Sequence, residues 1–314
     1  MTYPNSPIHR DRVLANFAVA YENFDLIADK LSPIVPTDEI SGTYFKRNKE
    51  SFALYTGQQV IGPSSDVPET EGDVTEGTFA CKGRGRMSKI PLQTDAQADI
   101  PLTLRQDAVM DAMSLLMLER EVRIATQLTT SGNFAAANTA TVGTKWDSTG
   151  NPLVDIDALR GNIWRAGNTR LVAYCGWDVW KGIKNNTNVL ARINGGATTA
   201  APALVLRQAF AELIEVDELV VGQAWYLPSV GGTQARVWGK DFGIVAVSNS
   251  PSTRSLSFAQ TMRWTAIGPG GVRHEQWIDP SKGTMGVERH KITMSDDEII
   301  PANDAGLLLK AAVT

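Results

Sequence analysis

The stretch SLLMLEREVRIATQLTTSGNF occupies positions 114–134. It has the pattern of the second half of a long helix followed by a polar loop of small residues. With the residues before it, it carries an apolar stripe at helical spacing, formed by Val109, Ala112, Met113, Leu116, Met117 and Ile124 and widened by Leu115, Leu118 and Val122. The stripe predicts a helix from Leu104 to Thr130, which at about 1.5 Å per residue would be about 40 Å long.

Local signals mark both ends of this predicted helix. Thr103 and Gln106 fit a capping box, in which the threonine oxygen accepts from an N-terminal amide and the glutamine reaches back. Gly132 favours a stop, and Glu119 and Arg123 have the spacing of an i,i+4 ion pair. The helix holds no nucleophile with a base, no metal-ligand spacing and no phosphate loop. We therefore expect it to be the spine of an elongated subunit.

The composition is that of a globular protein large enough for two cores. The chain has 314 residues, of which 43% are hydrophobic and 20% charged, and its net charge of −4 argues against a general polyanion binder. Cys81 and Cys175 stand far apart, so we expect buried reduced thiols. The start lacks a secretory apolar region, and no run is long enough to span a membrane, which predicts a cytoplasmic protein without membrane association.

Residues 1–40 and 41–100 are not expected to form cores of their own. In 1–40, prolines interrupt an apolar run at 24–36, which is typical of an extended arm without an evident partner in its own chain. In 41–100 a basic limb with Lys46, Arg47 and Lys49 leads into an acidic middle. A second, acid-free basic limb follows. Apolar residues are sparse there, so we expect a long hairpin that lies on something else.

The rest of the chain is richer in regular structure. Residues 155–265 alternate helix and strand patterns and are predicted to be a compact α/β unit. The tail contributes strand patterns at 284–294 and 305–313. We expect tryptophans of the compact unit to pack in its core (Trp164, Trp177, Trp180, Trp225 and Trp238), and some of the loop tryptophans to be interface anchors (Trp146, Trp264 and Trp277).

Candidate chemical motifs give no catalytic, cofactor or metal site. His9, His274 and His290 lack metal-ligand spacing and are expected at the surface or in turns. The basic segment KGRGRM at 82–87 lacks the P-loop pattern and is expected to be a flexible limb that contacts an acidic neighbour. The acidic run 296–298 is expected to be a solvated turn. A dispersed catalytic site stays open, because triads need no local motif.

The order of these segments resembles the major capsid proteins of tailed bacteriophages of the Hong Kong 97 type. The resemblance rests on local stretches in order along nearly the whole chain: FDLIADKLSPIVP (24–36), LEREVRIATQLTTSGNF (118–134), NTRLVAYCGWDVWKGIKNN (168–186), ELVVGQAWY (218–226), VWGKDFGIVAVS (237–248), SFAQTMRW (257–264) and AGLLLKAAV (305–313). It implies an α+β fold with an N-terminal arm, an extended loop, a peripheral domain built on the spine helix, and an axial α/β domain.

The resemblance divides the chain into five parts. They are an arm (1–40), an extended loop hairpin (41–100), a peripheral domain with the spine helix (101–154), an axial domain (155–265), and returning peripheral strands with a terminal axial strand (266–314). Because the arm begins almost at once, we expect scaffolding to be a separate protein or absent, or the chain to be the mature form.

As for function, the resemblance implies a shell of pentamers and hexamers around double-stranded DNA bound without sequence specificity, in the virion and, during assembly, in the host cytoplasm. Scaffolding, portal and decoration proteins are possible partners. The expected assembly residues are Asp66, Glu69, Glu71, Asp73, Glu76, Lys82, Arg84, Arg86, Lys89, Phe24 and Leu31.

Besides a tail-tube or decoration protein, two other functions remain open from the sequence. One is the shell of an encapsulin-like nanocompartment, which would hold an enzyme as cargo in place of DNA. The other is a cytoplasmic α/β enzyme with a dispersed site. Size-exclusion chromatography separates the enzyme from both shells, because an enzyme would elute as a small oligomer.

Overall fold

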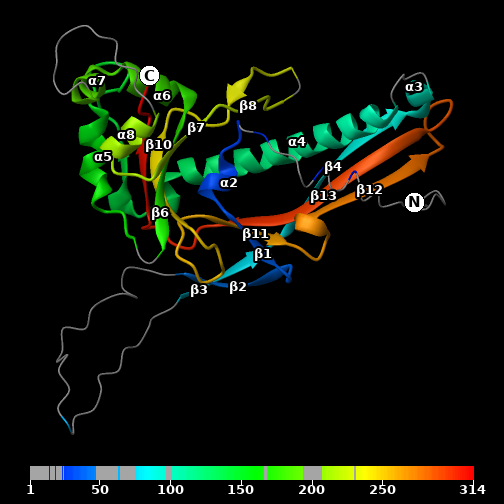
Figure 1. Ribbon diagram of the computed structural model, residues 1–314, viewed down its shortest axis with the longest axis horizontal. Helices are drawn as coiled ribbons and strands as arrows, with labels where there is room; N and C mark the ends of the chain where they lie inside the picture. Colours follow the sequence, from blue (N-terminus) through cyan, green and yellow to red (C-terminus); the bar gives the residue numbers. More distant parts are fainter. Residues whose placement is uncertain are drawn as a thin grey trace.

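The computed structural model describes residues 25–46, 75–96, 101–165, 168–193, 207–229 and 231–314, together with Leu14, Ala18, Asn23 and Pro63. Two lobes lie at the ends of an elongated molecule, and helix α4 (Pro101–Thr129) extends from one to the other (Figure 1). Among the described residues, no helix is both long and apolar enough to cross a membrane.

Helix α4 confirms the predicted spine but begins earlier. Pro101 occupies its first position, where a missing N–H is harmless, so Thr103 lies inside the first turn and the predicted capping box is wrong. The helix ends at Thr129 and a 3-10 turn follows at Ser131–Asn133. The apolar stripe is buried as predicted except for Met117, which is partly buried, whereas Leu115 is 49% exposed and does not widen the buried face.

The peripheral lobe is a sheet beneath α4, built around one long strand. Strand β13 (Val287–Ile299) pairs antiparallel with β4 (Lys82–Pro91) on one side. The other side of β13 pairs antiparallel with β12 (Val272–Asp279) opposite residues 287–294 and with β11 (Gln260–Trp264) opposite residues 296–299. Strand β11 in turn pairs in parallel with β1 (Ile34–Thr37). Val109, Met113 and Leu116 of α4 pack on Ile292 and Met294 of this sheet.

The axial lobe contains the larger core. Its five-stranded sheet has the order β5 (Thr139–Thr141), β14 (Gly306–Lys310), β10 (Phe242–Ser248), β6 (Thr169–Gly176) and β7 (Glu218–Gly222). Strands β6 and β10 are almost wholly buried, as expected for apolar runs covered on both faces. The helices of this lobe are α5 (Pro152–Arg160), α6 (Trp177–Asn185), α7 (Thr187–Ile193) and α8 (Arg207–Leu213).

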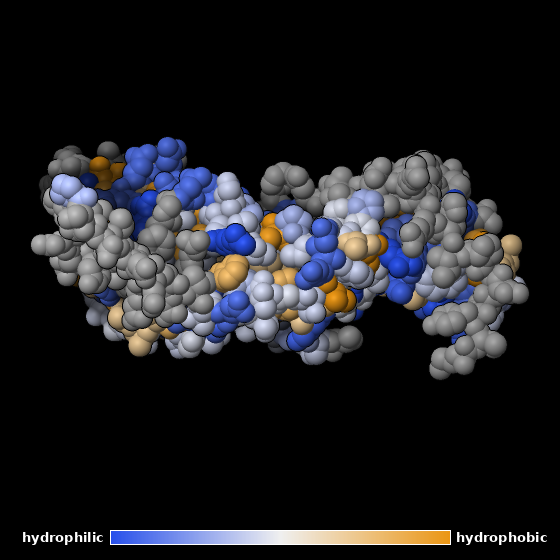
Figure 2. Space-filling model, turned by 90° about the horizontal axis from the view of Figure 1, so that it is seen from below, coloured by the Kyte–Doolittle hydropathy of each residue, from blue (hydrophilic) through white to orange (hydrophobic). Residues whose placement is uncertain are grey.

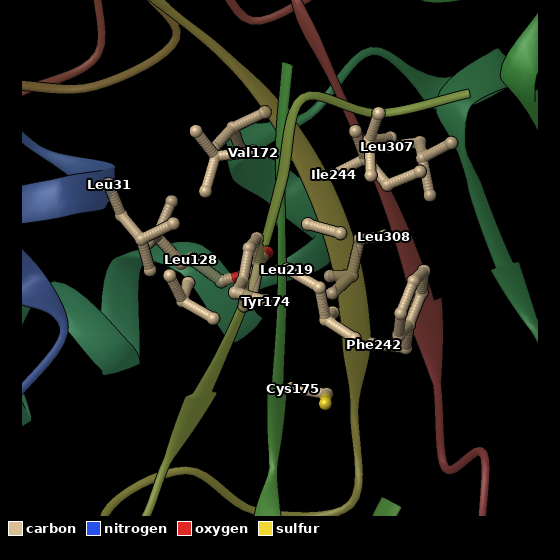
Figure 3. Packing of buried hydrophobic residues seen from close by; sticks show 14 of the residues in the cluster. Leu31, Leu128, Val172, Tyr174, Cys175, Leu219, Phe242, Ile244, Leu307 and Leu308 are labelled. Atoms are coloured by element: carbon tan, nitrogen blue, oxygen red, sulfur yellow. The ribbon is translucent and has the colours of Figure 1, made fainter. Parts of the chain in front are cut away.

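The end of the spine is anchored in this core. Figure 3 shows Leu128 of α4 and Leu31 close to Tyr174 of β6. The Tyr174 hydroxyl donates a hydrogen bond of 2.6 Å to the carbonyl oxygen of Leu128. Burial raises the pKa of the nearby Cys175 thiol to about 12, so the thiol stays protonated at neutral pH. Both cysteines are buried and free, as predicted.

A two-stranded ribbon projects below the two lobes (Figure 1). Strand β2 (Ser41–Lys46) pairs antiparallel with β3 (Thr75–Ala80), with Ser41 opposite Ala80 and Lys46 opposite Thr75. The Tyr44 ring covers Gly77, where an added Cβ would lie 2.5 Å from the ring. The remaining short elements are α2 (Ala28–Leu31), α3 (Leu92–Ala96), β8 (Trp225–Tyr226), β9 (Ala235–Arg236), and 3-10 turns at Ala136–Asn138 and Pro269–Gly271.

Candidate assembly surfaces

Glu121, in the C-terminal half of α4, is buried where the arm, the spine and the axial lobe meet. Its carboxylate accepts hydrogen bonds from the backbone N–H groups of Ile27 at 2.9 Å and Ala28 at 2.8 Å, and from Trp238 Nε1 at 2.6 Å. Burial raises the pKa of this carboxyl, although these bonds and the neighbouring Arg120 act to lower it. The side chain therefore holds together three segments that are far apart in sequence.

Arg120 makes a second connection at the same junction. Its guanidinium is buried, forms an ion pair with Asp29, and donates to the Ser32 carbonyl oxygen at 3.2 Å and to Thr261 Oγ1 at 3.1 Å. Leu31 is fully buried in the subunit's own core. The expectation that the arm lacks partners in its own chain is thus wrong for residues 27–32, because α4 supplies those partners.

The acidic run 296–298 lies in strand β13 and is not a solvated turn. Asp296 is fully buried, and burial together with the adjacent Glu298 raises its pKa, against the effect of nearby arginines. Arg123 donates to Glu298 at 2.6 Å and to Asp296 at 3.2 Å, and Arg84 lies 3.8 Å from Glu298. The predicted Glu119–Arg123 pair does not form, because Arg123 faces the sheet and Glu119 pairs with Arg86 of β4.

The basic segment at 82–89 is also not a flexible limb. It forms strand β4, in register with β13 from Lys82 opposite Asp296 to Pro91 opposite Val287. Arg84 and Arg86 are engaged within the subunit. Lys82 and Lys89 are exposed, and neither forms an ion pair with a described residue.

The structure describes only some of the other predicted assembly residues. Glu76 is exposed on β3, opposite Phe45, near the end of the ribbon that lies farthest along both strands from β1 and β4. Phe24 and the acidic residues of the middle segment lie outside the described part of the chain: Asp66, Glu69, Glu71 and Asp73.

A groove of about 700 Å³ lies between α4, β4 and the β8–β9 ribbon. Its apolar lining includes Leu115, Trp225 and Leu227, the last two 45% and 62% exposed. Arg236 stacks on Trp225 at 4.2 Å from the ring centroid. The prediction of a core role for Trp225 is therefore wrong, and Trp146, expected among interface candidates, is fully buried instead.

The face of the molecule that is seen from below carries a different pattern. Figure 2 shows apolar residues scattered among polar ones along the middle of the molecule, without a single broad apolar area in that view. Scattered apolar residues are ordinary at protein surfaces and do not by themselves mark a binding site. The groove beside Trp225 is for this reason the more informative surface feature.

The histidine prediction needs correction as well. His274 and His290 are both buried, and their ring nitrogens lie 3.2 Å apart across β12 and β13. In the described part of the chain, no group of three or more His, Cys, Asp or Glu side chains could hold a metal ion.

Known proteins resemble this chain in sequence as well as in architecture. No family model matches the chain. The major capsid protein of Pseudomonas phage JBD67 is 26% identical over 318 residues, which cover 98% of this chain and 99% of that protein. Over its whole length this chain is similar to a major capsid protein of a phage. The major capsid protein of Burkholderia phage BcepMu is also 26% identical to this chain, over 225 residues and 69% of each chain.

Comparison with solved structures shows which fold this protein has. A phage-related protein from Bordetella bronchiseptica RB50 superposes with a TM-score of 0.74 at 20% identity, covering 96% of this chain and 97% of that one. A putative capsid protein of an E. coli CFT073 prophage gives 0.57 at 14% identity, covering 98% and 100%. The predicted α+β fold, shared with phage capsid proteins, is thereby confirmed.

An encapsulin shell protein from Synechococcus elongatus PCC 7942 shares the fold more distantly. Its TM-score is 0.51 at 11% identity, with 96% of this chain and 95% of that one covered. Likeness at this identity shows the fold alone. The sequence relationship to phage capsid proteins makes the nanocompartment alternative the weaker one.

Proposed function

We propose that this capsid protein assembles, as pentamers and hexamers, into the icosahedral head shell of a tailed phage or prophage that encloses double-stranded DNA. The observation that carries the proposal is the end-to-end correspondence with the JBD67 capsid protein, 98% of one chain against 99% of the other. A relationship confined to one lobe would support only a shared domain. The role is structural, and assembly in the host cytoplasm would precede incorporation into the virion.

The shape of the subunit supports assembly on physical grounds. A ribbon projects from the two lobes, and large apolar side chains such as Trp225 and Leu227 are exposed beside the spine. Obligate interfaces commonly bury about 2,000 Å² or more, which would cover such surfaces in the assembled shell. The net charge of −4 also suits a container, because a strongly basic wall would retain DNA.

We assign the five parts of the chain as the sequence analysis divides them: arm 1–40, extended loop 41–100, peripheral domain 101–154, axial domain 155–265, and returning strands 266–314. Within 41–100, β4 packs with the peripheral sheet, so the loop that reaches a neighbour would be the part before it. Scaffolding, portal and decoration proteins would be separate partners.

Electrostatics suggests one contact between neighbouring copies. The middle of the extended loop carries Asp66, Glu69, Glu71 and Asp73 without a basic residue. Lys82 and Lys89 are exposed on β4 and have no ion-pair partner among the described residues. We assign this strand as the basic surface on which the acidic loop of an adjacent copy docks. Arg84 and Arg86 would contribute less, because both already pair within their own subunit.

Expression of the full chain alone tests the proposal. Size-exclusion chromatography and negative-stain electron microscopy should show closed megadalton particles. A stable monomer or small oligomer, also in the presence of a crowding agent, would contradict self-assembly. Analysis of the contents of particles from phage lysates distinguishes a phage head from a nanocompartment. A phage head contains DNA, whereas a nanocompartment contains a co-purifying enzyme.

A further inference from the structure

The groove between α4, β4 and the β8–β9 ribbon gathers apolar side chains that remain open to solvent. Leu115, Trp225 and Leu227 line it and are 49%, 45% and 62% exposed. Large apolar side chains that share one hollow, unlike scattered ones, are typical of a binding surface. The groove is therefore suited to an occupant with an apolar side chain.

Strand β4 adds a positive charge to one wall of this groove. Arg84 lies 3.8 Å from Glu298 and 4.0 Å from Asp296, and both distances are too long for a hydrogen bond. The Arg84 side chain is 24% exposed, and its guanidinium makes no hydrogen bond to a residue that the structure describes. The groove can thus accept a carboxylate beside the apolar side chain.

The turn between β1 and β2 carries this combination of side chains. Asp38, Glu39 and Ile40 are consecutive and exposed, and the exposed fraction of Ile40 is 50%. Within the described part of the chain, Glu39 forms no ion pair. The turn 38–40 therefore offers an apolar side chain and carboxylates to the same partner.

Hydrogen bonds hold the turn 38–40 in place. The carbonyl oxygen of Asp38 accepts from Trp264 Nε1 at 2.9 Å, and Asp38 Oδ1 accepts from Thr265 Oγ1 at 3.3 Å. The carbonyl oxygen of Ile40 accepts from the backbone N–H of Cys81 at 2.7 Å. A turn fixed in this way loses little conformational freedom when it binds.

The groove and the turn lie on different long sides of the subunit. Figure 1 shows β8 on one side of α4 and the β2–β3 ribbon, which the turn precedes, on the other side. The turn is thus held away from the groove of its own subunit. In a ring of copies, a rotation places one side of each copy against the other side of the next, and such a heterologous contact repeats until the ring closes.

We propose that the turn 38–40 of one copy docks in the groove of the next copy around a ring. Ile40 packs against Trp225 and Leu227, and the carboxylate of Glu39 lies beside Arg84. The opposite charges and the exposed apolar side chains on the two surfaces carry this assignment. The inference rests on the proposed shell and names one contact that joins neighbouring subunits within a ring.

Cysteine cross-linking in assembled particles tests this contact. The double variant Ile40→Cys/Leu227→Cys, assembled under reducing conditions and then oxidised, should give a ladder of covalent multimers on a non-reducing gel, because each subunit would bond to two neighbours. Cys81 and Cys175 are buried and should not take part. The matched control is Ile40→Cys/Met285→Cys, since Met285 is 58% exposed and lies outside the groove. The control should give no ladder.

The outcomes separate this inference from the proposed function. Particles of the double variant that give no ladder, or a ladder no stronger than that of the control, overturn the docking and leave the shell intact. A cross-link of Leu227→Cys with Leu54→Cys of the extended loop, in place of Ile40→Cys, also overturns it, because the loop would then occupy the groove. Failure of the natural protein to form particles contradicts the proposed function and this inference with it.

Assembly thresholds decide the question if the cysteine variants form no particles. Ile40→Asp and Leu227→Asp should each raise the concentration at which particles form by about tenfold or more, because each removes the same buried apolar contact, while circular dichroism shows folded subunits. The double variant should do no worse than the more affected single variant, since the two side chains share one contact. Effects that multiply would place the two side chains in separate contacts and overturn the proposal, as would an unchanged threshold in either single variant.

Discussion

Individual buried side chains join parts of this capsid protein that are remote in sequence. Glu121 does so through three accepted hydrogen bonds, and Arg120 through the arm and β11. The sequence marks these two residues only as part of a stretch that resembles phage capsid proteins. It could not assign their partners, because a polar pair inside an apolar helix gives no information about which distant donors will reach it.

Replacement of Glu121 by alanine should strongly destabilise the subunit. It would leave the N–H groups of Ile27, Ala28 and Trp238 without their acceptor, and each unsatisfied buried donor costs about 1–3 kcal/mol. Denaturant unfolding should therefore show a loss of several kcal/mol. Trp238→Phe, which removes one donor and keeps an aromatic ring, should cost less. Equal losses in the two variants would contradict the assigned role.

The raised pKa of Glu121 also predicts a pH dependence. Between the ordinary value of 4.5 and the raised folded value, the folded state keeps a proton that the unfolded chain has released. The contribution of Glu121 to stability therefore falls as the pH rises through the folded pKa. Relative to Glu121→Gln, the natural protein should lose stability from acidic to neutral pH. A difference that stays constant with pH would show that the pKa is not raised.

At the scale of elements, α4 was predictable and its sheet was not. The helix was expected at 104–130 and lies at Pro101–Thr129, because a repeating apolar stripe is a local signal. Strand β4 was missed because its exposed glycines and basic residues give no alternating apolar pattern. Only pairing with β13, which follows in sequence after the whole axial lobe, makes it a strand.

Adjacent residues of α4 provide a matched test of its buried face. Leu116 is 1% exposed, so Leu116→Asp should prevent folding, because a buried unpaired carboxylate is strongly unfavourable. Leu115 is 49% exposed, and Leu115→Asp should give a folded, soluble subunit. Circular dichroism and solubility measurements distinguish the two variants. Soluble, folded Leu116→Asp protein would mean that the stripe is assigned to the wrong face.

The arm should be needed for folding of the subunit as well as for assembly. Removal of residues 1–36 takes away Leu31 from the core and two of the three donors to Glu121. We expect insoluble or unfolded protein by circular dichroism. Removal of residues 1–12, which stops short of Leu14, is the control and should leave the subunit folded. A folded 37–314 fragment would show that the contacts at the junction contribute little.

At the scale of the whole molecule, charge order along the extended loop should affect assembly more than folding. Replacing Glu69, Glu71 and Asp73 together with lysine should slow or misdirect assembly, because lysines would then face Lys82 and Lys89 of the neighbour. Exposed ion pairs contribute only about 0.2–1 kcal/mol each, so the subunit itself should remain folded. Light scattering follows the assembly rate.

Salt provides the control for this charge reversal. Assembly of the natural protein should weaken above a few tenths molar salt, where the Debye length falls below about 6 Å. The triple variant should lose that dependence. Normal assembly of the variant with an unchanged response to salt would show that the acidic loop is only a solvated surface.

The sequence by itself determined the elements with a strong local period: the spine helix, the buried strands β6, β10 and β14, and the order of segments that resembles phage capsid proteins. Tertiary structure decided which polar groups meet. Asp296 is buried in β13 rather than exposed in a turn, Arg123 pairs with Glu298 rather than Glu119, and His274 lies against His290. The reason is physical: periodicity reports which face of an element avoids water, whereas the partner of a buried charge depends on sheet register between distant segments.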